Sequence, residues 1–295
     1  MEKSNIKEFS LSERLKLRAA YREQGELRLK LANKAQDLRE LVALKHFAGF
    51  ILDGEASLLA TGNLPETFIF ESIIEYFKRS NNEIFSGAVL DVGAHIGFHS
   101  LYLSKYFKSA SSFEPHPLTY KLLEFNALNS KRNIKTFNFA LQDCIGSAFL
   151  YDHKMINIGG STLVRKKTKT KLKFRVKVKT LDSLQIKGRI TFIKLDIENS
   201  EYKFLKGGRN LISKNMPVIA MEDSVTDKGK SDSILFLEEI GYTKFMHFVI
   251  QPNRNDNYIK LRLIKLFISR QRFILKLAPV NFNICAKYPI ILCLP

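Results

Sequence analysis

The feature that most constrains the fold is a regular alternation of strand-like and helix-like segments from about residue 88 onward. Short segments rich in Val, Ile, Leu and Phe are separated by longer segments that suit helices. The expected strands are AVLDV (88–92), SSFE (111–114), IKTFNFA (134–140), TFIKLDI (191–197), PVIAME (217–222) and YTKFMHFVI (242–250). Strands that alternate with helices are typical of an α/β protein built on a parallel sheet.

In such a sheet, ligands bind at the end where the parallel strands finish. The loops that should meet there follow five of the expected strands, after Val92, Glu114, Ala140, Ile197 and Glu222. Polar side chains in these loops are therefore the first candidates for binding and catalysis.

The loop after the first strand, VLDVGAHIGFHS at 89–100, resembles a nucleotide-binding turn that lacks one glycine. A dinucleotide site has the pattern G-x-G-x-x-G, whose second glycine lets a pyrophosphate approach the backbone. His95 stands at that position, where its Cβ would crowd a pyrophosphate, and the sequence contains no P-loop pattern. The turn therefore favours an adenosine ligand without phosphates, such as S-adenosylmethionine, bound by Asp91, Gly93, Ala94, His95 and Gly97.

Two acidic residues further along the chain suit the same ligand. Glu114 ends the second strand, 23 residues after Asp91, where a carboxylate can accept both ribose hydroxyl protons. Asp143 follows the third strand and is placed to reach an adenine amino group. Acidic residues are common in loops, so it is their order after a strand, a glycine turn and a helix that indicates this ligand.

These segments resemble, in order, the motifs of the FkbM family of S-adenosylmethionine-dependent methyltransferases. LDVGAHIGFHS is similar to the first motif, in which Asn is commoner than His95, and FEPHP at 113–117 is similar to the second. NFALQD, IGGSTL, VKTLDSL and IKLDIENSEYKFLKGG follow in the family's order, so the resemblance covers about residues 60–225. The family generally has glycine where Asn199 stands, and Asn tolerates left-handed backbone better than most residues.

The resemblance implies a class I methyltransferase fold over residues 61–295. That fold is Rossmann-like, with a mostly parallel seven-stranded sheet and helices on both faces. The resemblance also implies an O-methyltransferase acting on a hydroxyl of a sugar, a glycolipid or a natural product. In the second motif, Pro115 would join Glu114 beside the cofactor.

Methyl transfer to a hydroxyl requires alignment of the nucleophile with the methyl carbon and removal of the hydroxyl proton. The segment KLDIENSE is the candidate site, because Lys194, Asp196 and Glu198 alternate along a strand and its exit and could share one face. Asp196, at the strand tip, could hold the donor or the acceptor hydroxyl. Glu222 ends the neighbouring strand and is expected beside Asp196, so Lys194, Asp196 and Glu222 are the predicted catalytic residues.

Other polar residues of these loops have less specific predicted roles. Glu198, and His153 on a loop near the site, are candidates for binding the acceptor, whereas Glu201 is expected to favour the helix dipole. Clustered acids could also bind Mg²⁺ or Ca²⁺, but a pairing of Lys and Asp explains them without an ion. His95 and His99 have a metal-compatible spacing, yet HExxH is absent, so a hydrogen-bonded histidine beside the cofactor is favoured.

The chain is strongly basic, with 47 Lys and Arg against 29 Asp and Glu and a net charge of +18. This balance favours anionic partners, although a lysine-rich composition raises the charge without any partner. RKKTKTKLKFRVKVK at 165–179 holds nine basic residues and no acid. It could bind a phosphorylated glycan, a nucleic acid or a lipid surface, or it could form a solvated hairpin whose second half is a strand with a charged face.

The two ends of the chain lie outside the family resemblance. Residues 1–60 are expected to form a helical extension with an apolar stripe, which either lies on the chain's own domain or forms the seam of a homodimer. A basic and apolar insertion at about 255–280 contains YIKLRLIKLFISRQRFILKL. It could be an amphipathic helix in peripheral contact with a membrane, or it could cover the end of the sheet.

The cysteines favour a cytoplasmic location, which leaves room for peripheral contact with a membrane. Cys144, Cys285 and Cys293 are scattered and odd in number, as expected of reduced thiols. No apolar run approaches the ~18 residues that a membrane span needs.

Two other functions remain open alongside O-methylation. The net charge favours an RNA methyltransferase, but the sequence has neither an NPPY-type motif nor a Cys in a Pro-Cys context. A non-catalytic adaptor that keeps the fold and docks through its ends is the other alternative.

Overall fold

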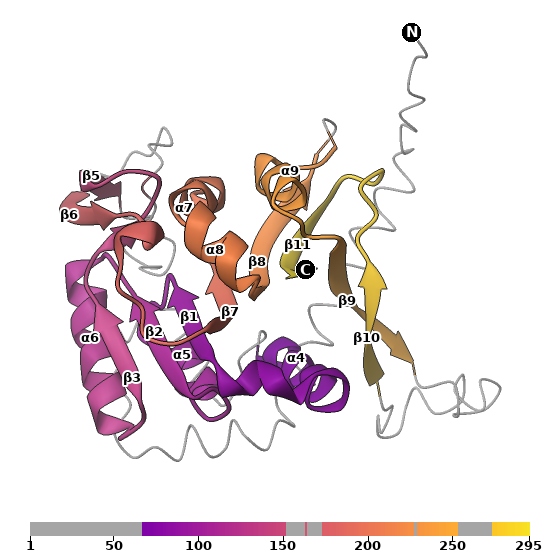
Figure 1. Ribbon diagram of the computed structural model, residues 1–295, viewed down its shortest axis with the longest axis horizontal. Coiled ribbons are helices and arrows are strands. Elements are labelled where there is room, and N and C mark those ends of the chain that lie inside the picture. The colour runs from indigo at the N-terminus through magenta and orange to yellow at the C-terminus, as the bar shows by residue number, and fades with distance from the viewer. Residues whose placement is uncertain (1–66, 152–162, 164–172, 227–228, 253–272) are drawn as a thin grey trace, which may run out of the picture.

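A mixed eight-stranded sheet forms the centre of the part of the chain that the structure describes, residues 67–151, 163, 173–226, 229–252 and 273–295. In this computed structural model the strand order is β10-β9-β11-β8-β7-β1-β2-β3 (Figure 1). The strands that pair in parallel with one another are β1 (Ala88–Val92), β2 (Ser109–Phe113), β3 (Ile134–Phe137), β7 (Ile190–Leu195) and β8 (Val218–Val225).

The other strands of this sheet are β9 (Lys244–Pro252), β10 (Phe273–Pro279) and β11 (Ala286–Leu294). β11 is antiparallel to both β8 and β9, and β10 is antiparallel to β9. β9 therefore runs in the same direction as β8, and six of the eight strands share one direction. The mostly parallel α/β sheet predicted from the sequence is confirmed.

The sheet has one strand more than the predicted seven, because β10 extends its edge beside β9. β10 includes residues 273–277, the end of the segment for which an amphipathic helix was one expectation, so this end is a strand. The N-terminal helical extension, and the part of the basic insertion from 255 to 272, lie outside the described residues. No helix among the described residues is long and apolar enough to cross a membrane.

Helices cover both faces of the large sheet (Figure 1). One face carries α4 (Thr67–Ser80), α5 (Phe98–Leu103) and α6 (Pro117–Asn129), and the other carries α7 (Glu201–Gly207), α8 (Arg209–Asn215) and α9 (Asp232–Glu239). Each face has its own apolar core. Val89 of β1 contributes to the core with α4 and α5, whereas the next residue, Leu90, contributes to the core with α7 and α8. β1 is therefore buried at every position, as expected of a central parallel strand.

A second, three-stranded sheet lies at the end of the large sheet where the parallel strands finish (Figure 1). Its strands are β4 (Ala140–Leu141), β6 (Lys173–Lys179) and β5 (Gly146–Tyr151), in that order. The predicted strand at 134–140 is interrupted, because β3 ends at Phe137 and Ala140 pairs with Val178 in the second sheet. β6 confirms the strand predicted in the second half of the basic stretch.

One further strand boundary differs from the prediction, and the difference moves a predicted site residue. The strand expected to end at Glu222 continues to Val225, because β11 pairs with it along most of its length. Glu222 therefore lies within β8 and not at its tip.

Candidate functional site

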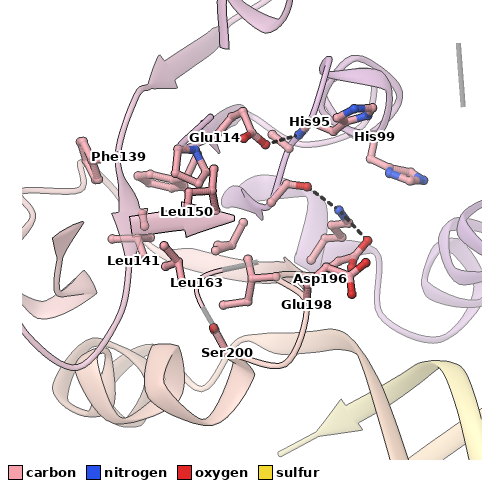
Figure 2. Close-up of a pocket in the computed structure, with 18 of the residues that line it drawn as sticks. His95, His99, Glu114, Phe139, Leu141, Leu150, Leu163, Asp196, Glu198 and Ser200 are labelled. Atoms are coloured by element: carbon pink, nitrogen blue, oxygen red, sulfur yellow. Dashed lines mark hydrogen bonds and ion pairs between the residues drawn. The ribbon is translucent and has the colours of Figure 1, made fainter. Parts of the chain in front are cut away.

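A pocket lies where β1, β2 and β7 end, and the second sheet forms one of its walls (Figure 2). The loops after these strands supply its polar side, which includes Glu114, Asp196 and Glu198. Its apolar side is formed by Phe139, Leu141, Leu150 and Leu163. Of the five segments expected to meet here, those after Val92, Glu114, Ala140 and Ile197 contribute to the described lining, whereas the segment after Glu222 does not.

The glycine turn after β1 makes close backbone contacts with the ends of β2 and β7. Gly93 has a φ of +81°, and a Cβ at this position would lie 1.8 Å from the backbone oxygen of Asp196. The Gly93 and Ala94 amides both donate to the Phe113 carbonyl oxygen, at 3.0 Å each. His95 also adopts a left-handed backbone, with φ of +50°. The turn therefore depends on glycine at 93 because the chain after β7 passes directly against it.

Glu114, at the end of β2, binds the turn through its side chain. Its Oε2 accepts from the His95 amide at 2.9 Å, and its Oε1 accepts from the His116 amide at 2.8 Å. The side chain lines the pocket although the residue is only 7% exposed. Burial raises the pKa of Glu114, while nearby His95 and the two amide donors oppose this shift. Each carboxylate oxygen keeps a second lone pair, so Glu114 can still accept from ligand hydroxyl groups.

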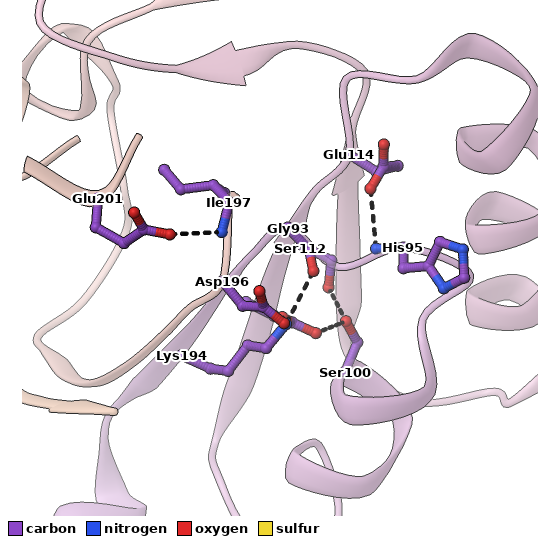
Figure 3. A network of polar contacts seen from close by, with 10 residues as sticks. Gly93, His95, Ser100, Ser112, Glu114, Lys194, Asp196, Ile197 and Glu201 are labelled. Atoms are coloured by element: carbon purple, nitrogen blue, oxygen red, sulfur yellow. Dashed lines mark hydrogen bonds and ion pairs between the residues drawn. The ribbon is translucent and has the colours of Figure 1, made fainter. Parts of the chain in front are cut away.

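A buried ionic network joins the first strand to the loop after β7 (Figure 3). The Lys194 ammonium donates to the Gly93 carbonyl oxygen at 2.9 Å and lies 3.4 Å from Asp91 Oδ1 and 3.5 Å from Asp196 Oδ2. Asp91 is fully buried, and its Oδ2 accepts from Ser100 Oγ at 2.5 Å. Burial raises the pKa of Asp91, and Lys194 is the strongest influence in the opposite direction.

Asp91 therefore lies behind the pocket lining and supports it through its ion pair with Lys194. It does not belong to the described pocket lining, whereas Lys194 and Asp196 do. A direct contact between Asp91 and a cofactor, as the sequence suggested, has no support from this geometry. Its carboxylate acts through Lys194, which it anchors against the glycine turn.

The loop after β7 contains two consecutive residues with left-handed backbone, Glu198 (φ +51°) and Asn199 (φ +70°). The expectation that Asn199 could replace a glycine in this turn is confirmed, because it adopts the conformation that glycine favours. The left-handed Glu198 was not anticipated. Ser200, which follows, lines the pocket, and its buried hydroxyl makes no hydrogen bond within the described part of the chain.

Glu201, the first residue of α7, fastens this loop (Figure 3). Its Oε1 accepts from the Ile197 amide at 3.2 Å. Burial raises its pKa to about 7, and the neighbouring Asp196 carboxylate adds to the shift. Its position in the first turn is compatible with the expected helix-dipole role, but its hydrogen bond is to the pocket loop. The sequence feature that could have predicted this hydrogen bond is the acidic residue two positions after Asn199, close enough to accept from the backbone of the same turn.

Four predicted site residues within the described part of the chain do not line the pocket: Asp91, Gly97, Asp143 and Glu222. Asp143 forms an ion pair with Lys206 at 2.7 Å, and this contact lowers the pKa of Asp143. Glu222 forms an ion pair with Lys287 of β11. His153 lies outside the described residues. The remaining predicted residues line the pocket, namely Gly93, Ala94, His95, Glu114, Pro115, Lys194, Asp196 and Glu198, whereas Gly97 packs against Leu123 of α6.

The apolar wall was missed by reasoning from the sequence. Leu141 and Leu150 come from β4 and β5, and Phe139 precedes β4. Pairing of β5 with β6 places Leu150 opposite Phe174, whose ring contacts His116 beside Glu114, with centroids 4.5 Å apart. The second sheet is thus connected to the loop that carries Glu114.

The charge of the pocket favours a cationic ligand. Glu114, Asp196 and Glu198 line it, and Lys194 is the one Lys or Arg among the described lining residues. His95 and His99 also line it, and the His99 ring lies 4.7 Å from that of Phe70. In the described part of the chain, no group of three or more His, Cys, Asp or Glu could hold a metal ion.

The fold and the pocket define a Rossmann-like α/β protein with an acidic site at the ends of its parallel strands. Comparison with known protein families matches residues 91–244, just over half of the chain, to the family described as Methyltransferase FkbM domain. The chain belongs to this methyltransferase family, as its motifs predicted. A comparison with curated proteins returned no match.

Among solved structures, the FkbM methyltransferase of Methylobacillus flagellatus KT is 20% identical, with a TM-score of 0.38. The alignment covers 72% of this chain but 54% of that protein, so the chain spans about half of that relative's length. A precorrin-6y C5,15-methyltransferase of Geobacter metallireducens GS-15 is 10% identical, with a TM-score of 0.37 and coverages of 75% and 89%. An rRNA methylase of Streptococcus thermophilus is 10% identical, with a TM-score of 0.32 and coverages of 68% and 92%.

Proposed function

We propose that the chain is an S-adenosylmethionine-dependent O-methyltransferase whose acceptor is a hydroxyl group of a sugar, a glycolipid or a natural product. The observation that carries the proposal is the convergence of Glu114, the glycine turn and Asp196 on one acidic pocket. An acidic pocket suits a ligand whose sulfur and amino group are both positively charged. It disfavours a pyrophosphate, which would face three carboxylates.

The residues of the pocket fit the cofactor's other parts as well. Glu114 keeps acceptor capacity for ribose hydroxyl groups, since each of its oxygens accepts one backbone amide in the structure. The apolar wall of Phe139, Leu141 and Leu150 suits an adenine ring. The buried hydroxyl of Ser200, which has no hydrogen-bond partner among the described residues, could bind a polar group of the cofactor or of the acceptor. When bound, S-adenosylmethionine supplies a methyl carbon activated by a positively charged sulfur.

Asp196 is the residue that we assign to the acceptor hydroxyl. Its side chain is 37% exposed at the pocket, whereas that of Lys194 beside it is 6% exposed. The cofactor would supply the methyl group and leave as a neutral thioether, so that the acceptor exchanges its O–H bond for an O–CH3 bond. The Asp196 carboxylate would accept the displaced proton, which water can then remove. General-base assistance of this kind contributes roughly 100- to 10,000-fold to a rate.

Lys194 is assigned as the positioning residue of this step. Its ammonium lies between Asp91, Asp196 and the Gly93 carbonyl oxygen, so it fixes the carboxylate of Asp196 relative to the glycine turn. Glu198, at the pocket edge of the same loop, is placed to bind further hydroxyl groups of the acceptor.

The proposal is tested by transfer of isotope-labelled methyl groups from S-adenosylmethionine to fractions of a cell extract. We expect label in the carbohydrate or glycolipid fraction with the wild type, and none with Asp196→Asn. Label in RNA that survives removal of glycans would contradict the proposed acceptor class. Binding of S-adenosylmethionine without transfer to any fraction would instead support the adaptor alternative.

A further inference from the structure

The second sheet has two faces of opposite chemistry. Pairing of β5 with β6 places Leu150, Val176 and Val178 on one face, where all three are buried and Leu150 lines the pocket. The other face carries Lys173, Arg175 and Lys177, all exposed. One sheet therefore supplies a wall of the reaction pocket with its inner side and a basic surface with its outer side. The outer residues are called the basic face.

The cations of the basic face are evenly spaced. Residues two apart on a strand are about 6.6 Å apart, so Lys173, Arg175 and Lys177 form a row about 13 Å long. Their partners on β5 are Tyr151, Phe149 and Ser147. Neither strand contains an acidic residue, and no ion pair to an acid is present for these three cations within the described residues. Within the described residues, the three positive charges of the row are therefore not neutralised by an ion pair.

The contacts made by this row hold the side chains without neutralising them. Arg175 Nε donates to Ser147 Oγ at 3.1 Å, which leaves the other guanidinium donors available. Lys173 Nζ lies 4.4 Å from the centre of the Phe149 ring. Both interactions orient a cation along the strand, and neither supplies a negative charge.

We infer that the basic face binds the acidic groups of the acceptor, which makes the acceptor an acidic glycan, a sugar chain that carries phosphate or carboxylate groups. This inference rests on the proposed function and narrows its acceptor class. The acceptor's charges bind the outer side of the sheet, and a neutral hydroxyl further along the sugar chain enters the acidic pocket. Among the described strands β4 and β5 are the two edges of this sheet, and the inference routes the sugar chain across β5, whose Leu150 lines the pocket.

The same observations disfavour a nucleic acid. Proteins that bind single strands combine basic grooves with aromatic platforms for successive bases. On the basic face the aromatic side chains of β5 and β6 are Phe149 and Tyr151, and the Phe149 ring already has the Lys173 ammonium over it. A nucleic acid would also bring its closely spaced phosphates to the carboxylates of the pocket, whereas an acidic glycan can keep its charges apart from the reacting hydroxyl.

The test compares two charge-matched triple variants of the full chain. The first is Lys173→Gln with Arg175→Gln and Lys177→Gln, and the control is Lys131→Gln with Arg132→Gln and Lys214→Gln, which removes three exposed cations from other elements. The probes are a fluorescent heparin hexasaccharide, a neutral maltohexaose and a single-stranded RNA hexamer. Anisotropy titrations at two salt concentrations give the dissociation constants.

We expect the wild type to bind the heparin probe more tightly than the neutral sugar or the RNA, and more weakly at higher salt. The basic-face variant should lose at least about tenfold in affinity, whereas the control should change less than about twofold. Equal losses in both variants, no loss in the first, or tighter binding of the RNA would each overturn the inference. Calorimetry with S-adenosylmethionine, expected to be unchanged in both variants, shows that they are folded.

This experiment separates the inference from the proposed function, because sugar binding is measured without cofactor or turnover. If the wild type failed to bind S-adenosylmethionine, the proposed function would fail whether or not the basic face bound the acidic sugar. If cofactor binding and methyl transfer succeeded but the basic-face variant bound the heparin probe normally, only the inference would fail.

Discussion

The two halves of the pocket are fastened in different ways. On the side of β1 and β2, backbone amides of Gly93 and Ala94 donate to a backbone carbonyl, and the His95 amide donates to Glu114. On the side of β7, the left-handed loop is fastened to the side chain of Glu201 and to the Lys194 network. The first half depends on close approach of backbone, whereas the second depends on buried charges. The first should therefore be less tolerant of added volume, and the second more sensitive to loss of a charge.

The largest effect should follow Gly93→Ala, which attacks the first half directly. The new Cβ would lie 1.8 Å from the Asp196 oxygen in a residue with φ of +81°, so we expect a loss of more than about 4 kcal/mol in the free energy of unfolding. Gly188→Ala is the matched control, because its φ is +87° and nothing lies within 4 Å; strain alone should cost about 1–2 kcal/mol. Denaturant unfolding measures both, and equal losses would contradict the role of close approach.

Removal of the ammonium of Lys194 tests the second half. Lys194→Met leaves Asp91 buried without its ion pair, and breaking such a pair costs about 3–5 kcal/mol of stability. Asp91→Asn in the same chain should restore most of the loss, because an amide needs no counterion. Lys121→Met, in an exposed ion pair, should cost less than about 1 kcal/mol. A Lys194→Met protein as stable as the Lys121→Met protein would show that the network contributes little.

Asp196→Asn separates chemistry from binding on the same side of the pocket. The amide cannot accept the acceptor's proton, so turnover should fall roughly 100- to 10,000-fold. Cofactor affinity, measured by calorimetry, should stay within a few-fold of the wild type. Unchanged turnover would remove Asp196 from the reaction.

The pH dependence of stability tests the buried carboxylate of Glu201 on the side of β7. Burial raises the pKa of Glu201 from 4.5 to about 7, so between these values the folded chain holds a proton that the unfolded chain has released. Its contribution to stability is therefore present below pH 4.5 and lost as the pH rises through about 7, by roughly 3 kcal/mol in total. Unfolding at several pH values should show this slope in the wild type.

Glu201→Gln should reduce the slope between pH 4.5 and 7, because the amide does not titrate; the slope that remains belongs to other buried carboxylates such as Glu114. Glu83→Gln, at an exposed position, should leave it as in the wild type. A slope that is the same in all three proteins would assign the pH dependence to other groups.

The elements that were predictable from the sequence depend on residues that are neighbours in the chain. The apolar strands, the glycine turn and the order of Glu114 and Asp196 can all be recognised within short segments, and these segments form the parallel part of the sheet and its polar loops. The left-handed conformation of Asn199 was predictable for the same reason, since it is a property of one residue type in one turn.

The structure differs from the prediction where the partner of a residue or strand is distant in the sequence. β8 continues beyond Glu222 because β11 pairs with it, and Lys287 of β11 then forms an ion pair with Glu222. The predicted third strand is interrupted because Ala140 pairs with Val178 of the second sheet. Asp143 forms an ion pair with Lys206 of α7. None of these partners is near in sequence, so local patterns could not indicate them.

Titration of the wild type and Glu114→Gln with S-adenosylmethionine in a calorimeter tests the central claim most directly. Glu114→Gln carries no charge to bury, but its NH2 group cannot accept, so one of the two backbone-amide hydrogen bonds is lost and the unfolding of the variant is measured beside its affinity. We predict saturable binding by the wild type and affinity about 10- to 100-fold weaker in the variant. Glu222→Gln, the same change outside the described lining, should bind as the wild type does. Absence of binding by the wild type, or equal affinity in all three proteins, would contradict a cofactor pocket built around Glu114.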